Sequence, residues 1–203
     1  MTIKQTKNVI LIIVKTIFNN ENNKMSETIV LGGGCFWCVE SVYQNVGGVE
    51  AVESGYAGGN TDNPTYEQIC TGRTGHAEVV KVTFDPAKVS LTEILEVFFI
   101  ASHDPTTLNR QGNDVGTQYR SIILWNSEQQ LETAKTVIDK LNTDNVFSGK
   151  IVTELKELTD YYKAEQYHQN YFKRNPMQPY CLFSIPPKPV SYTHLRAHET
   201  ERN

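Results

Sequence analysis

This chain of 203 residues lacks any long hydrophobic run. Its most apolar stretch, NVILIIVKTIF near the N-terminus, is interrupted by Lys15 and is too short to span a bilayer. We therefore do not expect a membrane protein.

An excess of positive charge is also missing. The chain has 19 Lys and Arg against 23 Asp and Glu, which gives a formal net charge of -4. Proteins that bind nucleic acid usually concentrate basic residues on one surface, so nucleic acid is not an expected partner. A small, roughly neutral substrate or another protein is the expected partner.

Cysteine is scarce: the chain has only Cys35, Cys38, Cys70 and Cys181. Four unevenly spaced cysteines are too few for a secreted disulfide scaffold of this length. In a reducing cytoplasm, where we expect the protein, they would be free, catalytic or metal-bound. With 39% apolar and 21% charged residues, the composition fits one globular domain with short extensions.

Both ends differ in character from the rest of the chain. Residues 1–24 are expected to be a disordered or non-native extension before a start at Met25, the alternative being a weak anchor or export signal. Residues 190–203 resemble a translated sequencing adapter. His194 and His198 have the i,i+4 spacing of a helical metal-binding pair, but in an adapter-derived tail they are not expected to bind a metal. The predicted catalytic domain is 25–189.

Between these ends, strand and helix patterns alternate. A short strand runs into glycines, a helix follows, and two further strands flank a polar loop. Ser90 and Glu93 form a capping box that opens the second helix. The expected strands are 27–31, 49–56, 76–84, 117–126 and 150–158, and the expected helices are 35–46, 90–101 and 127–141. This order predicts an α+β, ferredoxin-like two-layer plait with an extra helix and strand and a coiled C-terminal segment.

Cys35 follows three glycines at the start of the first expected helix. Unpaired backbone N–H groups and the positive end of the helix dipole favour a thiolate there, and the glycines leave room for a substrate to approach. The alternative is an inert, buried cysteine after an ordinary turn.

Glu78 lies on the same face of its expected strand as Val80, Val82 and Phe84, by the alternation of a strand. Burial there would raise the pKa of the carboxyl and let it serve as a proton donor near neutral pH. The alternative is a strand-end glutamate that reaches solvent or pairs with Arg73.

Several sequence blocks together resemble one family, peptide methionine sulfoxide reductase of the A type. The resemblance covers about residues 28–188, with every block in order. The blocks are GCFW at 34–37, NPTYEQICTGRTGHAE at 63–78, HDPT at 103–106, RQGNDVGTQYRS at 110–121 and YHQNYFKRNP at 167–176.

The resemblance implies a role for each matching residue. It implies that Cys35 attacks the sulfoxide sulfur and that Glu78 protonates the sulfoxide oxygen. Tyr66, Tyr119 and Asp114 would bind and polarise that oxygen, and Phe36 and Trp37 would seat the S-methyl group. The substrates would be methionine-S-sulfoxide, free and protein-bound. No cofactor or metal is expected.

Attack would leave a sulfenic acid on Cys35, which a second thiol converts to a disulfide. The resemblance places the resolving cysteine, Cys181, in the C-terminal segment, while Cys38 one helical turn from Cys35 stays open as an alternative. Cys70 is expected to be buried and structural. Thioredoxin or a similar dithiol would reduce the disulfide of a monomeric enzyme.

Two other functions compete. The CFWC sequence also fits a general thiol-disulfide oxidoreductase that uses Cys35 and Cys38. A zinc-binding module built on the same cysteines and a histidine is a further alternative. His103 and His168 are expected to be core histidines, and the tyrosines of the expected last helix are expected to pack or line the rim. These are Tyr161, Tyr162, Tyr167 and Tyr171.

Overall fold

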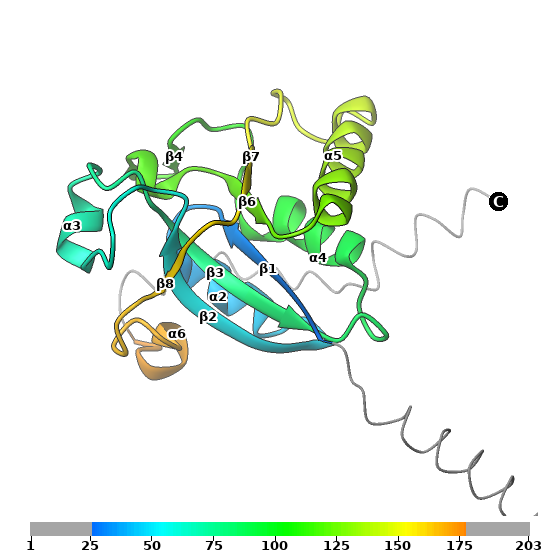
Figure 1. The fold of residues 1–203 in the computed structure, drawn as a ribbon. Coiled ribbons are helices and arrows are strands. Elements are labelled where there is room, and N and C mark those ends of the chain that lie inside the picture. The colour runs from blue at the N-terminus through cyan, green and yellow to red at the C-terminus, as the bar shows by residue number, and fades with distance from the viewer. Residues whose placement is uncertain (1–25, 178–203) are drawn as a thin grey trace, which may run out of the picture.

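The structure is a computed structural model that describes residues 26–177. A six-stranded mixed sheet forms its centre, in the order β7-β6-β1-β3-β2-β8 (Figure 1). All neighbours are antiparallel except β6 and β7, which are parallel. The strands are β1 (Glu27–Gly32), β2 (Val49–Ala57), β3 (Ala77–Phe84), β6 (Ile122–Trp125), β7 (Glu154–Glu157) and β8 (Tyr161–Lys163).

Three helices cover one face of this sheet, α2 (Phe36–Tyr43), α4 (Leu91–Val97) and α5 (Glu128–Thr143). Phe36, Val39 and Tyr43 of α2 pack there with strand side chains such as Val80 and Phe84, and all of them are buried. Each fully buried large apolar side chain contributes roughly 1.5–3 kcal/mol to folding, so this face holds the main core.

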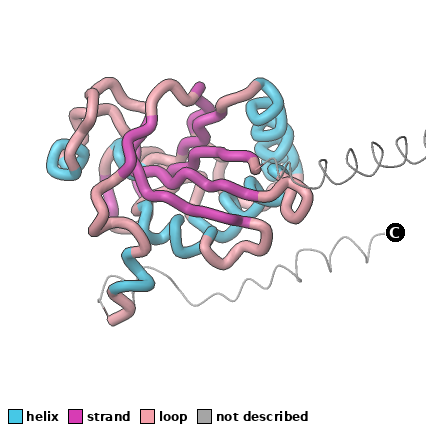
Figure 2. The backbone as a smooth tube through the Cα atoms, turned by 60° about the horizontal axis from the view of Figure 1, so that its bottom comes forward, coloured by secondary structure: helices cyan, strands magenta, loops and turns pink. Residues whose placement is uncertain are grey.

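The chain that joins β7 to β8 runs over the opposite face of the sheet. Leu158 and Tyr161 pack there against a second, smaller cluster that includes Val30, Val79 and Leu124. In Figure 2, helices lie below the strands and at their upper right, and loop segments run above the strands. The fold is therefore a mixed α/β arrangement in which β3 is covered on both sides.

Short elements complete the chain: α3 (Tyr66–Cys70), a π-helical turn at Phe98–Ser102, the hairpin of β4 (Arg110–Gln111) and β5 (Asp114–Val115), a 3-10 turn at Thr117–Tyr119, and α6 (Tyr171–Arg174).

The main elements lie close to their predicted positions. The capping box of Ser90 and Glu93 is present, with Ser90 Oγ accepting from Glu93 N at 3.2 Å. The helix after it passes into the π-helical turn at Phe98, near the predicted end. Ser127 caps α5 as its predicted range implies.

Other predictions were wrong in detail. The expected polar loop before β3 contains α3, which is capped by Thr65 and Gln68. The expected strand 117–126 begins with a 3-10 turn, and the expected strand 150–158 shortens to β7. Tyr161 and Tyr162 lie on a strand that was not predicted, β8, rather than on the last helix. Tyr167 lies in a turn, and Tyr171 begins α6.

Candidate active site

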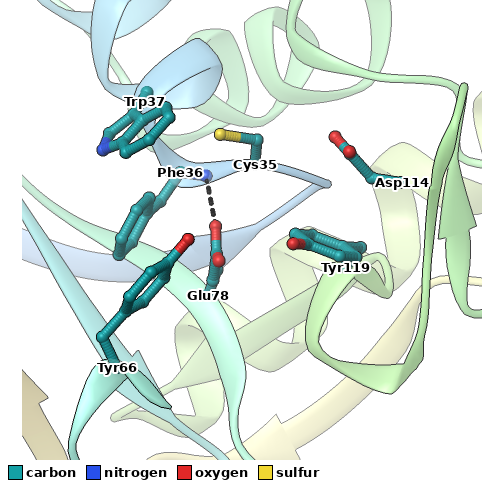
Figure 3. A pocket seen from close by; sticks show the side chains of 7 residues that line it. All are labelled: Cys35, Phe36, Trp37, Tyr66, Glu78, Asp114 and Tyr119. Atoms are coloured by element: carbon teal, nitrogen blue, oxygen red, sulfur yellow. Dashed lines mark hydrogen bonds between the residues drawn. The ribbon is translucent and has the colours of Figure 1, made fainter. Parts of the chain in front are cut away.

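A small pocket opens beside the N-terminal end of α2 (Figure 3). Its cavity of about 110 Å³ suits the end of one side chain, because sites for drug-sized ligands measure about 300–1,000 Å³. Its lining comes from α2, α3, β3, β5 and the 3-10 turn, and consists of Cys35, Phe36, Trp37, Tyr66, Glu78, Asp114 and Tyr119. The structure thus brings together every predicted site residue except Cys181, which lies outside the described residues.

Cys35 is the N-cap residue of α2, with extended backbone angles and a mostly buried side chain. Its carbonyl oxygen accepts the N–H groups of Cys38 at 3.1 Å and Val39 at 3.4 Å. Cys35 therefore stands at the N-terminal end of α2, where the positive end of the helix dipole favours a thiolate.

The glycines before Cys35 are required by close packing. Gly34 has a φ of +86°, and a Cβ there would come within 2.6 Å of Gln111 Cγ. A Cβ on Gly33 would come within 2.7 Å of the His103 ring. His103 bonds Ser121 Oγ through Nε2 at 2.6 Å, and burial lowers its pKa to about 4, so it is a neutral supporting residue as predicted.

Glu78 is buried on the core side of β3, as the strand alternation predicted. Its Oε2 accepts a hydrogen bond from Phe36 N at 3.1 Å, at the first turn of α2. Burial raises the pKa of this carboxyl well above its ordinary value, nearby Cys35 and Asp114 raise it further, and the bond from Phe36 opposes them only in part. The carboxyl therefore keeps its proton to a higher pH than an exposed glutamate does.

Two phenols and a carboxylate stand on the other sides of Glu78 (Figure 3). Tyr66 comes from α3 and Tyr119 from the 3-10 turn. Burial, and then the proximity of Glu78, raises the pKa of both phenols far above the ordinary value, so both remain hydrogen-bond donors. Asp114 is placed at the pocket by the β4–β5 hairpin.

Phe36 and Trp37 form an apolar wall beside the thiol. The Trp37 ring stacks on Tyr171 with centroids 3.7 Å apart and an interplanar angle of 7°. Its Nε1 donates to His168 Nδ1 at 3.1 Å, and burial lowers the pKa of His168. His168 is a core residue as predicted, while the support that Tyr171 gives to Trp37 had no sequence signal beyond its family block.

The cysteines other than Cys35 differ in exposure. Cys38 is half-buried and packs against the main core. Cys70 is exposed at the end of α3, so its prediction as a buried structural residue was wrong. The α3 helix is short and only Ile69 of it is buried, which leaves Cys70 at the surface one turn from Tyr66.

Residues 26–177 contain neither a metal-binding cluster nor a membrane-spanning helix. No group of three or more His, Cys, Asp or Glu side chains within residues 26–177 is arranged to hold a metal ion. None of the helices described there is long and apolar enough to cross a membrane.

A cysteine at a helix N-terminus, opposite a buried carboxyl with a raised pKa and two phenols, is an arrangement typical of a thiol-based enzyme site. Residues 27–201 match the family described as Peptide methionine sulfoxide reductase. The chain belongs to this family, and its relatives are of the A type.

The curated relatives match closely. The chain is 66% identical over 164 residues to Peptide methionine sulfoxide reductase MsrA of Trichodesmium erythraeum, covering 81% of this chain and 92% of that protein. It is 57% identical over 159 residues to MsrA of Acinetobacter baumannii, and the match covers 78% of this chain and 90% of that protein.

Solved structures are similar as well. Methionine sulfoxide reductase A of Corynebacterium diphtheriae has a TM-score of 0.68 at 39% identity, covering 77% of this chain and 78% of its own. Reduced Mxr1 of Saccharomyces cerevisiae has a TM-score of 0.72 at 34% identity, and the match covers 79% of this chain and 91% of Mxr1. Mxr1 in complex with Trx2 shares the fold with a TM-score of 0.52 at 23% identity, covering 74% and 87%.

Proposed function

We propose that the protein reduces methionine-S-sulfoxide, free and in proteins, to methionine. The observation that carries this proposal is that the Cys35 thiol and the Glu78 carboxyl, whose pKa burial raises, line one small pocket. A sulfoxide sulfur is a poor electrophile until its oxygen is protonated, so the reaction needs a nucleophile and an acid together.

In the first step, the Cys35 thiolate attacks the sulfoxide sulfur while Glu78 gives its proton to the oxygen. Tyr66 and Tyr119 donate hydrogen bonds to the same oxygen, and Asp114 accepts a hydrogen bond from that oxygen once it carries a proton. The hydroxyl then moves from the substrate sulfur to the Cys35 sulfur, and the transient S–S bond and the original S–O bond both break. Cys35 is left oxidised to a sulfenic acid, and methionine leaves with its sulfur reduced by two electrons.

In the second step, the thiol of Cys181 attacks the sulfenic sulfur, a disulfide forms and the oxygen leaves as water. A dithiol protein of the thioredoxin class then reduces the disulfide by exchange. The complex of the related Mxr1 with Trx2 supports a partner of this kind.

The wall of Phe36 and Trp37 selects one sulfur epimer. With the methyl group against this wall and the oxygen directed toward Glu78, the long arm of the substrate can leave the pocket only on the remaining side. Inverting the sulfur would exchange two of these groups, and a pocket of this size would reject the bulkier arm at the methyl position.

The finer description of the fold belongs to the same proposal. The order β6-β1-β3-β2 with antiparallel neighbours supports a ferredoxin-like plait, to which β7 and β8 add edge strands. We place the catalytic domain at 25–189 of a monomeric, cytoplasmic enzyme, with 1–24 an extension and 190–203 a non-native tail.

The decisive experiment offers a racemic mixture of the two methionine sulfoxide epimers with dithiothreitol as reductant. We expect consumption to stop near half, with only the S epimer lost. Consumption of both epimers would contradict the proposal. Insulin reduction in the absence of sulfoxide would instead support a general thiol-disulfide oxidoreductase.

A further inference from the structure

Tyr66 reaches the pocket from an outlying part of the chain. It begins α3 within the long connection between β2 and β3, and α3 stands to one side of the sheet (Figure 1). Near the start of this connection, Gly58 O accepts Lys156 Nζ at 2.8 Å and Asp62 accepts the Tyr162 hydroxyl at 3.3 Å. The Tyr66 ring itself packs against His168, with ring centroids 4.4 Å apart. None of these contacts reaches the backbone of Tyr66, and a phenol that must donate to a substrate oxygen needs its backbone held as well.

Glu165 supplies a polar contact at the first residue of α3. Its Oε1 accepts the backbone N–H of Tyr66 at 2.9 Å, and its Oε2 accepts the Tyr56 hydroxyl at 2.7 Å. Both bonds end on one carboxylate, so Glu165 joins α3 to β2.

Glu165 is a carboxylate rather than a neutral acid. Partial burial alone would raise its pKa, but the bonds from Tyr56 and Tyr66 outweigh that effect, and its pKa lies below the ordinary value. Bonds to an ionised acceptor are shorter and stronger than bonds between neutral groups. The side chain is about one-third exposed, and the neighbouring Ala164 is fixed to β2 through its N–H to Ser54 O at 2.9 Å.

Tyr56 connects this contact to the acid of the pocket. It is buried, it pairs with Glu78 across the β2–β3 ladder, and its ring packs 5.9 Å from that of Phe36. The chain of contacts therefore runs from Glu78 and Phe36 through Tyr56 and Glu165 to Tyr66.

We propose that Glu165 is a positioning residue, which holds the Tyr66 hydroxyl at a fixed place relative to Glu78. The proposal rests on the proposed sulfoxide reduction, because it explains how one hydrogen-bond donor of that reaction, the Tyr66 hydroxyl, is held in place. Glu165 lies outside the pocket lining, and the proposal assigns its effect on the reaction to the bond with Tyr66 N–H and not to the bond with Tyr56. Its removal therefore matters only while Tyr66 has a hydroxyl.

The test is a double-mutant cycle on kcat/KM for methionine sulfoxide, with dithiothreitol as reductant. We expect Glu165→Ala to lower kcat/KM by about 10-fold, since small misplacements of a catalytic group are costly. We expect Glu165→Gln to stay within about 3-fold of the wild type, because an amide can still accept from Tyr66 N–H and bond Tyr56. In a Tyr66→Phe background, Glu165→Ala should have no further effect. Multiplying effects in the double variant would overturn the proposal.

A matched control removes a neighbouring carboxylate. Glu67 follows Tyr66 on α3 and is exposed, with no part in the contact to Tyr56. Glu67→Ala should leave kcat/KM unchanged. A loss equal to that of Glu165→Ala would mean that the charge near α3 matters and not the bond to Tyr66.

Two further measurements separate this proposal from folding and from the reaction itself. Tyr56→Phe removes one of the two bonds of Glu165 and should give a smaller loss that also disappears in the Tyr66→Phe background. With ring-labelled tyrosine, Glu165→Ala should shift the NMR resonance of Tyr66, identified by its absence in Tyr66→Phe. An unmoved resonance would overturn the positioning role, whereas a wild type that releases no methionine would contradict the proposed function alone.

Discussion

Glu78 accepts its hydrogen bond from the backbone N–H of Phe36, the residue directly after Cys35. The acid and the nucleophile are therefore held together by the first turn of α2. A shift of this turn would therefore displace the Cys35 thiol and the bond that fixes the Glu78 carboxyl together.

The first prediction concerns the proton of Glu78. Glu78→Gln keeps an acceptor for Phe36 N–H but has no acidic proton, so the rate of sulfoxide reduction should fall by roughly 100-fold or more. Circular dichroism and the melting temperature should show an intact fold. A variant that unfolds, or that keeps the full rate, would remove the acid role from Glu78.

The second prediction concerns the pH dependence of stability. Glu78 keeps its proton to a higher pH in the folded protein than in the unfolded chain, where its pKa has the ordinary value of 4.5. Between these two pKa values the folded state binds more protons, so this group makes the free energy of unfolding decrease as pH rises above 4.5.

Glu78→Gln should remove this contribution. Denaturant unfolding at several pH values should show the wild type losing more stability with rising pH than the variant does. Glu40, another buried carboxyl with a raised pKa, remains in both proteins and cancels in the difference. Parallel curves would mean that Glu78 is ionised in the folded protein.

The third prediction tests the glycine turn before Cys35. Gly34→Ala places a Cβ against Gln111 in left-handed backbone, which costs roughly 1–2 kcal/mol before the contact itself is counted. The melting temperature should fall by several degrees, and the activity should fall because Cys35 is the next residue. The control is Gly47→Ala, where a Cβ meets nothing within 4 Å, and it should change stability by less than about 0.5 kcal/mol.

Local chemistry explains what could be predicted from the sequence. Strand alternation placed Glu78 on the core side, and the capping box of Ser90 and Glu93 located α4, because these patterns depend only on near neighbours. The convergence of Tyr66 and Asp114 on Cys35 came from the family resemblance and not from spacing. These residues meet through long connections whose path no local pattern specifies.

The errors have physical reasons too. The strand β8 has only three residues, and its tyrosines show no alternation that distinguishes a strand from a helix. Cys70 was expected to be buried from its position in a family block, but α3 is short and only Ile69 of it is buried. The bonds of Glu165 depend on two segments about 100 residues away, which sequence alone does not bring together.

The fourth prediction concerns the C-terminal end. Cutting the chain after Lys188 should change neither activity nor melting temperature, because residues 190–203 resemble an adapter. The family match extends to residue 201, so the measurement decides whether this end contributes to the fold. A contribution of 1 kcal/mol would shift the melting temperature by about 2–4 °C, which calorimetry detects.

The last prediction is that Cys181 resolves the Cys35 sulfenic acid. Cys38 is near enough in sequence, but it is half-buried against the main core, where close packing restricts the rotation that a disulfide needs. After one turnover, peptide mapping without reductant should show a crosslink between Cys35 and Cys181. Cys181→Ser should still release one methionine per enzyme and then stop cycling with thioredoxin.

The exposed Cys70 provides a matched control, because Cys70→Ser should cycle at the wild-type rate. Full thioredoxin-driven turnover in Cys181→Ser, together with its loss in Cys38→Ser or Cys70→Ser, would assign the resolving role to that cysteine instead.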